Sequence, residues 1–240
     1  MARSVRKRHV QQELFRHGGK RPGAGRRPKG ARAGGAHKKR PKIKARHGLH
    51  VVLRVHPVVG NLRRRDMYQA IRGASVCAAV RERMKIVHIS IQRTHVHMIV
   101  EAENKKALAR GMQGFEISAA RRINTALGDG TRRRRGSVFI DRYHLVVLES
   151  PTQARHALSY VLNNWRKHAE DRHAAKGTLI DRFSSGCSFA DWKELEHRRM
   201  WEIPADHDPL VVSPPRSWLL TKGWKLVGTI SAREVPSKRG

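Results

Sequence analysis

The stretch KIVHISIQRTHVHMIVEA, residues 85–102, decides the fold of this chain. Two short apolar runs flank the polar turn at 92–94, which is the pattern of a β-hairpin. Successive side chains of a strand point to opposite faces, so His95 and His97 share one face of the second run. The stretch therefore predicts an antiparallel sheet that carries two imidazoles on one side.

Further elements are expected on both sides of this hairpin. They are a strand at 50–55, a helix that opens at a capping box of Asp66 and Gln69, a helix after Asn104, a strand or hairpin arm at 138–148, a helix from Ser150 to about residue 172, and a short helix near 189–202. The order β-α-β-β-α-β, followed by a helix, is typical of an α+β fold. We expect a ferredoxin-like, split β-α-β antiparallel sheet with helices on one face, plus a helix that carries Tyr160.

The charge restricts the partners of the protein. Fifty-one Lys and Arg against nineteen Asp and Glu give a formal net charge of +32. A polyanion is the natural partner for such a chain, and arginine suits bidentate phosphate contacts. A basic tail on an unrelated enzyme is the alternative explanation. Two isolated cysteines are too few for a disulfide framework or a cysteine-based zinc site. We expect neither a membrane span nor a signal peptide, and therefore a cytoplasmic protein.

Composition divides the chain into three parts. Residues 1–47 hold seventeen Lys and Arg and a single acidic residue, and are expected to form a disordered basic tail. Its segment Arg26-Arg27-Pro28-Lys29-Gly30 could read a narrow minor groove, or it could be a generic phosphate-binding arm. Residues 48–175 are expected to form the folded domain, and residues 176–240 a C-terminal extension of unclear role.

The first candidate site feature is the pair His95 and His97. Their spacing on a strand puts them about 7 Å apart along it, where two imidazoles can converge on one divalent metal. The alternative is two half-buried polar residues on an open sheet face. His88, His144 and His168 are further histidines that could border such a site.

The second feature is Tyr160 with Asn164, which lie one helical turn apart and hence on one face. They flank the apolar stripe of their helix, so the phenol could reach a cleft. The alternative is that the Tyr160 ring packs at the edge of the core while Asn164 is solvated. A phenol is a plausible nucleophile toward a phosphodiester, and a divalent metal can stabilise the developing charge.

These residues resemble the HUH-endonuclease superfamily, and within it the REP-associated tyrosine transposases, a single-tyrosine branch. The resemblance covers roughly residues 47–172 and rests on the triplet His95-Val96-His97 and on the helix ALSYVLNNWRKH at 157–168. Members of that branch usually have Asn-Pro where this chain has Asn164-Trp165, and the C-terminal extension is outside their minimal pattern.

The resemblance implies a mechanism. Tyr160 would attack single-stranded DNA and retain the 5′-phosphate as a covalent phosphotyrosine, while His95, His97 and Asn164 would bind Mg²⁺ or Mn²⁺. The substrate would be single-stranded or hairpin DNA, in a bacterial cell and close to the nucleoid, and the enzyme would be a monomer or a homodimer. The basic tail and the arginine loops would hold the DNA, through Arg26, Arg27, Lys29, Arg63, Arg64, Arg65, Arg132, Arg133, Arg134 and Arg135.

Two other functions remain open at this point. The chain could be a non-catalytic DNA- or RNA-binding protein, such as a domesticated relative of a transposase, because sheets of this topology also stack RNA bases. Such sheets expose Phe or Tyr on their central strands, and residues 85–101 contain none. A basic ribosome-associated protein is also compatible with the charge, but would not require the histidine pair and the tyrosine.

Overall fold

The computed structural model describes residues 41–236 except 81, 176 and 198–205. Most of the predicted basic tail, with Arg26, Arg27 and Lys29, lies outside the described residues. The strands are β1 (Gly48–Arg54), β2 (Met84–Ile91), β3 (His95–Ala102) and β4 (His144–Leu148). The α-helices are α1 (Arg65–Ala79), α2 (Lys105–Ala126), α3 (Pro151–Lys167) and α4 (Trp218–Thr221), and short 3-10 helices span Pro57–Val59, Glu170–His173, Ser185–Ser188, Lys193–His197 and Gly223–Val227.

The four strands form one antiparallel sheet in the order β2-β3-β1-β4. The hairpin predicted from residues 85–102 is the pair β2 and β3, and β1 joins β3 on its other side, so β3 is a central strand. The predicted α+β class and split β-α-β sheet are confirmed.

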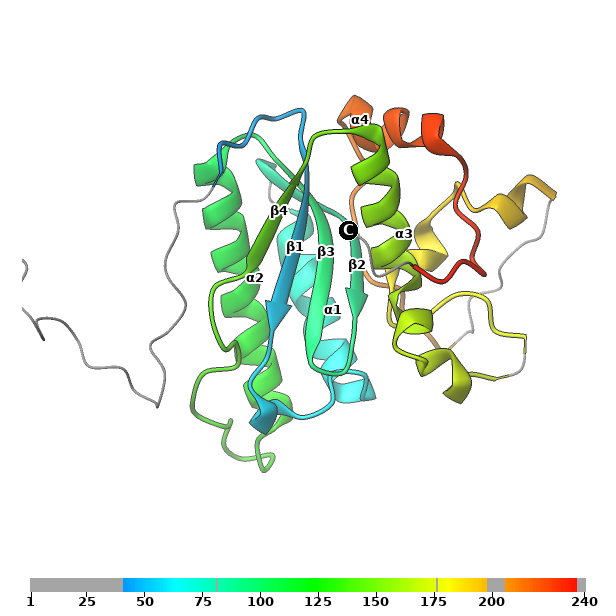
Figure 1. The fold of residues 1–240 in the computed structure, drawn as a ribbon. Helices are drawn as coiled ribbons and strands as arrows, with labels where there is room; N and C mark the ends of the chain where they lie inside the picture. The colour runs from blue at the N-terminus through cyan, green and yellow to red at the C-terminus, as the bar shows by residue number, and fades with distance from the viewer. Residues whose placement is uncertain (1–40, 81, 176, 198–205, 237–240) are drawn as a thin grey trace, which may run out of the picture. The chain divides into compact units, whose positions relative to one another are not determined.

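The two faces of the sheet carry different layers. Val96, Met98 and Val100 of β3 pack into the main core with α1 and α2, whereas Ile99 belongs to a second core with α3 and the C-terminal segments. Figure 1 shows α1 and α2 together on one side of the sheet and α3 on the other. Because strand side chains alternate, His97 shares the α3 side with Ile99.

Three predicted boundaries were wrong. Asp66 does not cap α1: the helix begins at Arg65, and the Asp66 carboxylate instead accepts a hydrogen bond from Arg64. The segment 138–148 is a strand only at His144–Leu148, because it approaches β1 earlier through a single bridge at Phe139. The helix expected near 189–202 is a short 3-10 turn in its described part.

The tyrosine-bearing helix is also shorter than predicted. α3 ends at Lys167, not near residue 172. Ala169 has a φ of 55°, the left-handed conformation that ends a helix. Two contacts favour the turn. Glu170 forms long ion pairs with Arg63 of the loop before α1 and with Arg93 of the turn before β3, and Asp171 pairs back to Arg166.

The C-terminal extension packs on α3. The Glu234 carboxylate accepts hydrogen bonds from the Arg155 guanidinium and the Ser159 hydroxyl, and the Asn163 amide donates to the Ser231 carbonyl. These bonds attach one side of α3 to the chain after residue 228. The helix is therefore held between the sheet and the extension.

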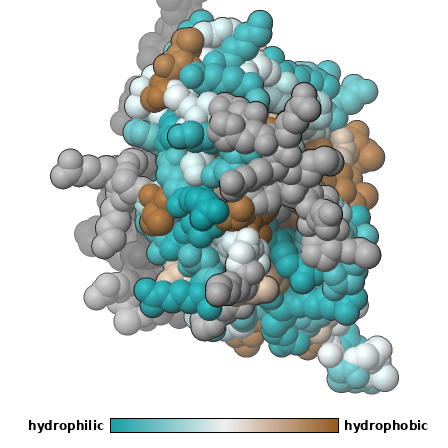
Figure 2. All heavy atoms as spheres, turned by 90° about the vertical axis from the view of Figure 1, so that its right-hand side faces the viewer, coloured by the Kyte–Doolittle hydropathy of each residue, from teal (hydrophilic) through white to brown (hydrophobic). Residues whose placement is uncertain are grey.

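The visible surface on this side is polar. Figure 2 shows the side of the molecule that lies at the right of Figure 1, and hydrophilic side chains predominate where described atoms are visible. Hydrophobic side chains occur there in small separate areas, which is ordinary for a protein surface. None of the helices in the described part of the chain is long and apolar enough to cross a membrane.

We predict that Glu234→Gln lowers the free energy of unfolding by about 1–2 kcal/mol, because a half-buried carboxylate loses charge-assisted hydrogen bonds. Burial raises the pKa of the Glu234 carboxyl, but the bonds from Arg155 and Ser159 outweigh it and the net pKa is lowered from 4.5. The difference between the proteins should therefore be complete above pH 4.5 and disappear as the pH falls through the folded pKa.

Urea unfolding at several pH values measures this difference. The matched control is Glu103→Gln, because Glu103 pairs with Arg83 on the exposed surface. Its expected effect is below about 0.5 kcal/mol. Equal losses in the two variants would show that the Glu234 bonds do not hold α3.

Candidate active site

β3 brings two histidines onto the sheet face that α3 covers. The ring centroids of His95 and His97 lie 4.6 Å apart, with the rings nearly perpendicular. His97 is buried, whereas His95 is partly exposed at the start of the strand. The alternation expected from the sequence thus places both imidazoles together.

α3 brings a phenol to the same place. The Ser150 hydroxyl accepts a hydrogen bond from the backbone N–H of Gln153, which caps the helix where the sequence predicted its start. Further along the helix, the Tyr160 ring lies 5.1 Å from the His97 ring, edge to face. The Lys167 ammonium lies 4.4 Å from the centroid of the Tyr160 ring.

Asn164 lies between the tyrosine and the end of the helix. His168, the C-cap of α3, has its ring 5.5 Å from the His95 ring, and Tyr160 contacts His97. Residues 160, 164 and 168 are spaced by four and lie along one face of the helix. Tyr160 and His168, at the two ends of this row, each contact one histidine of the pair, and helical spacing puts Asn164 on the same side of α3.

The Asn164 amide is fully buried and without a partner. Among the described residues, nothing hydrogen-bonds to its oxygen or its nitrogen. An unsatisfied buried polar group costs about 1–3 kcal/mol, so its persistence points to a use for the group. The alternative of a solvated Asn164 is excluded by its burial.

A third histidine, His50 on β1, completes the group and was missed in the sequence analysis. Its Nε2 lies 3.1 Å from Nδ1 of His97, and its ring lies 5.8 Å from the Tyr160 ring. A bond donated by His97 Nδ1 to His50 would leave Nε2 of His97 with a free lone pair. That Nε2 is buried and has no partner in the described part of the chain.

The histidines are held neutral. Burial, reinforced by the charges of His50 and His95, lowers the pKa of His97 to about 2. Burial first, and then His168 and Arg54, lowers the pKa of His95 to about 4. Neutral imidazole is the form that binds metals.

The phenol is protonated at rest. Burial raises the pKa of Tyr160, and the positive charge of Arg54 opposes that shift. A tyrosine nucleophile must lose its proton as it attacks, and the nearby Arg54 and Lys167 charges favour the ionised form.

The donor atoms at this site suit a divalent cation. In the described ranges, no three His, Cys, Asp or Glu side chains converge as a metal site. Two candidate donor atoms, Nε2 of His97 and Oδ1 of Asn164, are buried and have no hydrogen-bond partner among the residues that the structure describes. Amide oxygens suit Mg²⁺ and Mn²⁺, and neutral imidazoles also bind divalent metals.

The arginines predicted to contact DNA differ in their exposure and in their hydrogen bonds within the protein. Arg64, before α1, and Arg65, the first residue of α1, are exposed, whereas Arg63 donates two hydrogen bonds of 2.7 and 2.8 Å to Asp181. In the second loop, Arg132, Arg133 and Arg135 are exposed, and Arg134 donates to Asn124.

Both loops lie at the end of the sheet where β3 begins. The N–H of Leu62 donates to the carbonyl of Arg93, in the turn before His95. The N–H of Ile140 donates to the carbonyl of Arg54, which pairs with His95. The exposed arginines therefore lie at the same end of the sheet as His95.

Two other histidines are not part of the cluster. His88 is buried, lies 3.2 Å from the Ser185 hydroxyl and packs against Phe189. His144 is exposed on β4, and its charge contributes to the lowered pKa of His50. His168 is the only one of the three bordering histidines whose ring contacts the pair.

Comparisons with known proteins agree with this arrangement. The family described as "Transposase IS200 like" matches residues 44–164, about half of the chain. The matched range contains the histidine pair and Tyr160 and ends at Asn164. The chain therefore belongs to the IS200-like transposase family.

Two solved structures match the chain. One is a REP-associated tyrosine transposase bound to a REP hairpin, with a TM-score of 0.49 and 15% identity over 74% of this chain and 99% of that chain. The other is a candidate transposase from Deinococcus radiodurans, with a TM-score of 0.36 and 13% identity over 60% of this chain and 100% of that chain. Among curated proteins, none matches the chain.

We predict that Asn164→Leu leaves the free energy of unfolding unchanged or raises it by about 1 kcal/mol, because an apolar side chain of similar size replaces an amide without partners. The neighbouring Asn163 is the matched control. It is equally buried but donates to the Ser231 carbonyl, so Asn163→Leu should cost about 1–3 kcal/mol. Thermal and urea unfolding measure both. An equal loss in Asn164→Leu would mean that its amide has a partner in solution.

Proposed function

We propose that this transposase-family protein cleaves single-stranded DNA and transfers the cut strand through a covalent 5′-phosphotyrosine on Tyr160. One observation carries the proposal: the Tyr160 ring lies against the buried His97, whose ring contacts His95, and the same helix carries the buried, unpartnered amide of Asn164 one turn further on. The REP-associated branch is the kind of transposase that the sequence resembles.

The reaction follows from what each side chain can do. The Tyr160 oxygen attacks the phosphorus of the scissile phosphate. The bond between that phosphorus and the 3′ oxygen breaks, and the 5′-phosphate of the cut strand stays on the tyrosine. The phenolic proton leaves to solvent, and the departing 3′ oxygen takes up a proton as a free hydroxyl. That hydroxyl, or another, can later attack the phosphotyrosine and release Tyr160.

We assign the ligands of a divalent cation, Mg²⁺ or Mn²⁺, to His95, His97 and Asn164. When bound, the cation would polarise the scissile phosphate and offset its growing charge. His50 would orient the His97 ring through its contact with Nδ1, as second-layer partners of metal-binding histidines do. Burial would fix the position of the Asn164 side chain, so that its amide oxygen can bind the ion.

The rest of the chain is assigned to DNA binding and support. We propose that the tail at 1–47 and the exposed arginines of the two loops contact phosphates of a hairpin substrate. Residues 48–175 would be the catalytic domain. The extension at 176–240 would support it, as its hydrogen bonds to α3 suggest.

Replacing Tyr160 with Phe should abolish covalent protein–DNA adducts while leaving DNA binding within about twofold, because only the nucleophilic oxygen is removed. Labelled hairpin repeats from the region around the encoding gene are incubated with MnCl₂ and analysed on denaturing gels, and binding is measured by gel shift. Tyr68→Phe is the control: the Tyr68 hydroxyl donates to the Asp208 carbonyl and lies next to His207, on the face of the sheet opposite His97, so adducts should persist. Adducts in Tyr160→Phe, or shifted bands without any cleavage in the unaltered protein, would contradict the proposal.

Metal binding can be tested without the reaction. We expect His97→Ala and Asn164→Leu to weaken Mn²⁺ binding at least about tenfold, because each removes a ligand. Calorimetry or paramagnetic resonance of free Mn²⁺ gives the affinity. The exposed His156 of α3 serves as control, and His156→Ala should bind Mn²⁺ as the unaltered protein does. Equal affinity in all four proteins would exclude these ligands.

A further inference from the structure

Arg54, the last residue of β1, lies on the same face of the sheet as the histidine pair. It stands directly opposite His95 in the antiparallel pairing of β1 with β3. Side chains of directly opposite residues leave the same face of a sheet, with their Cβ atoms about 5 Å apart. His50, four residues earlier on β1, shares this face by alternation, and its ring lies near the Tyr160 ring. β1 therefore presents an imidazole and a guanidinium on the side of the sheet where the tyrosine lies.

The positive charge of Arg54 acts on both the tyrosine and the nearer histidine. Burial raises the pKa of Tyr160, and the charge of Arg54 lowers it. Burial lowers the pKa of His95, and the charges of His168 and then of Arg54 lower it further. A phosphate that Tyr160 attacks beside the histidines would therefore lie within the field of this cation.

The backbone of Arg54 is fixed, whereas its side chain is exposed to solvent. Its carbonyl accepts a hydrogen bond from the N–H of Ile140, and the next N–H along the chain, that of Val55, donates to the Thr94 carbonyl. On this face of the sheet, α3 packs over β2 and β3, and β1 lies on the other side of β3 from β2 (Figure 1). A DNA strand can therefore reach Arg54 without any movement of α3.

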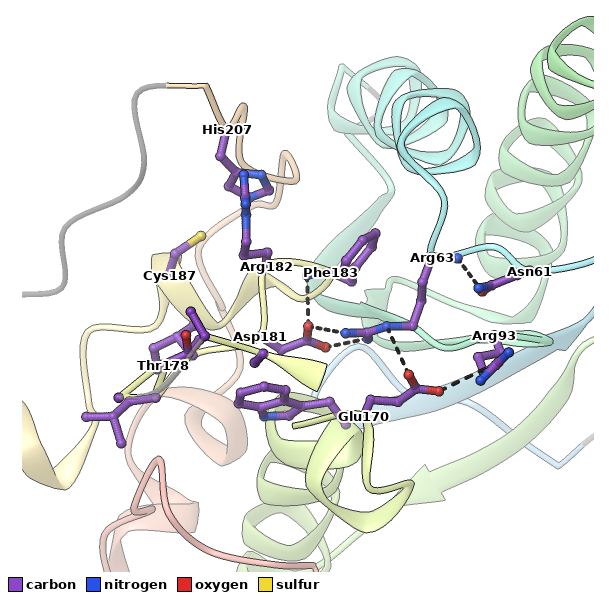
Figure 3. A pocket seen from close by; sticks show the side chains of 16 residues that line it. Asn61, Arg63, Arg93, Glu170, Thr178, Asp181, Arg182, Phe183, Cys187 and His207 are labelled. Carbon is purple, nitrogen blue, oxygen red and sulfur yellow. Dashed lines mark hydrogen bonds and ion pairs between the residues drawn. The ribbon is translucent and has the colours of Figure 1, made fainter. Parts of the chain in front are cut away.

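The Arg54 guanidinium forms no ion pair and no hydrogen bond among the described residues. Two other arginines at this end of the sheet have carboxylate partners. Figure 3 shows the Arg63 guanidinium between the carboxylates of Asp181 and Glu170. Nε of Arg93 lies 3.9 Å from the Glu170 carboxylate. Arg54 therefore keeps its N–H donors for another anion, and the planar guanidinium suits the oxygens of a phosphate.

We propose that Arg54 is a further catalytic residue, which donates hydrogen bonds to a non-bridging oxygen of the scissile phosphate. The inference rests on the proposed function, because it takes the attack of Tyr160 on DNA as the reaction. The negative charge of the phosphate repels the incoming phenol oxygen, and a cation fixed beside the phosphate offsets that charge and lowers the barrier. The guanidinium keeps its proton throughout, so Arg54 adds no proton transfer to the reaction.

The first test measures binding of the full chain to hairpin DNA in EDTA. An uncharged methylphosphonate replaces each phosphate of the unpaired strand in turn. We expect one position at which the replacement weakens binding of the unaltered protein at least about threefold, because a contact between a cation and a phosphate is lost. In Arg54→Gln the replacement at that position should cost nothing, since the cation is already absent. Arg54→Lys, which keeps the charge, should retain part of the cost.

The second test adds MnCl₂ to unmodified hairpin DNA and measures covalent adducts. The cleavage position should be the position found in EDTA, and Arg54→Gln should form adducts about a hundredfold more slowly than the unaltered protein. The matched control is Arg121→Gln, because Arg121 is an exposed arginine of α2, on the opposite side of the sheet. This control should keep both the adduct rate and the position-specific cost of the methylphosphonate.

The two tests separate the role of Arg54 from the cleavage mechanism. Adducts that form equally fast in Arg54→Gln, or a methylphosphonate cost that is the same in Arg54→Gln and the unaltered protein at every position, overturn the inference alone. A slower reaction in Arg54→Gln without a change in the methylphosphonate profile also overturns it, because that result means a structural role. An Arg54-dependent position in EDTA without any adducts in the unaltered protein overturns the cleavage mechanism.

Discussion

The packing of α3 across the histidine face of the sheet is the contact on which the candidate site depends. β3 supplies His97 from a central strand that is fixed on both edges by backbone hydrogen bonds. α3 supplies Tyr160 and is held from behind by bonds between Glu234, Ser159 and Arg155. A small rotation of α3 would separate the phenol from the imidazoles, because neither α3 nor β3 alone carries all the residues of the candidate site.

Unsatisfied polar groups buried at this contact lower the free energy of unfolding. The Asn164 amide and Nε2 of His97 are buried without hydrogen-bond partners among the described residues. Asn163, one residue earlier, is equally buried and is satisfied by the extension. Of these two adjacent asparagines, one is satisfied by the extension, and the other, which we propose to be a metal ligand, has no partner among the described residues.

A pocket lined by Trp165 and Glu170 lies next to the C-terminal end of α3. The lining of this pocket comes largely from residues after the family match. The turn of the chain at Ala169 ends the helix early and brings Glu170 to the arginines of the loop before α1 and the turn before β3. The extension therefore contributes both to holding α3 and to shaping the surface beside the site.

Local sequence patterns determined much of the secondary structure and of the candidate site. Alternation placed His95 and His97 on one face, helical spacing placed Tyr160 with Asn164, and the capping residues Ser150 and Asn104 marked two helix starts, because these features depend only on neighbouring residues. Tertiary structure decided the rest. His50 joins the site only because β1 pairs with β3, and Asn164 is buried only because the extension and the sheet enclose α3. Such contacts join residues far apart in the chain, and no short-range pattern encodes them.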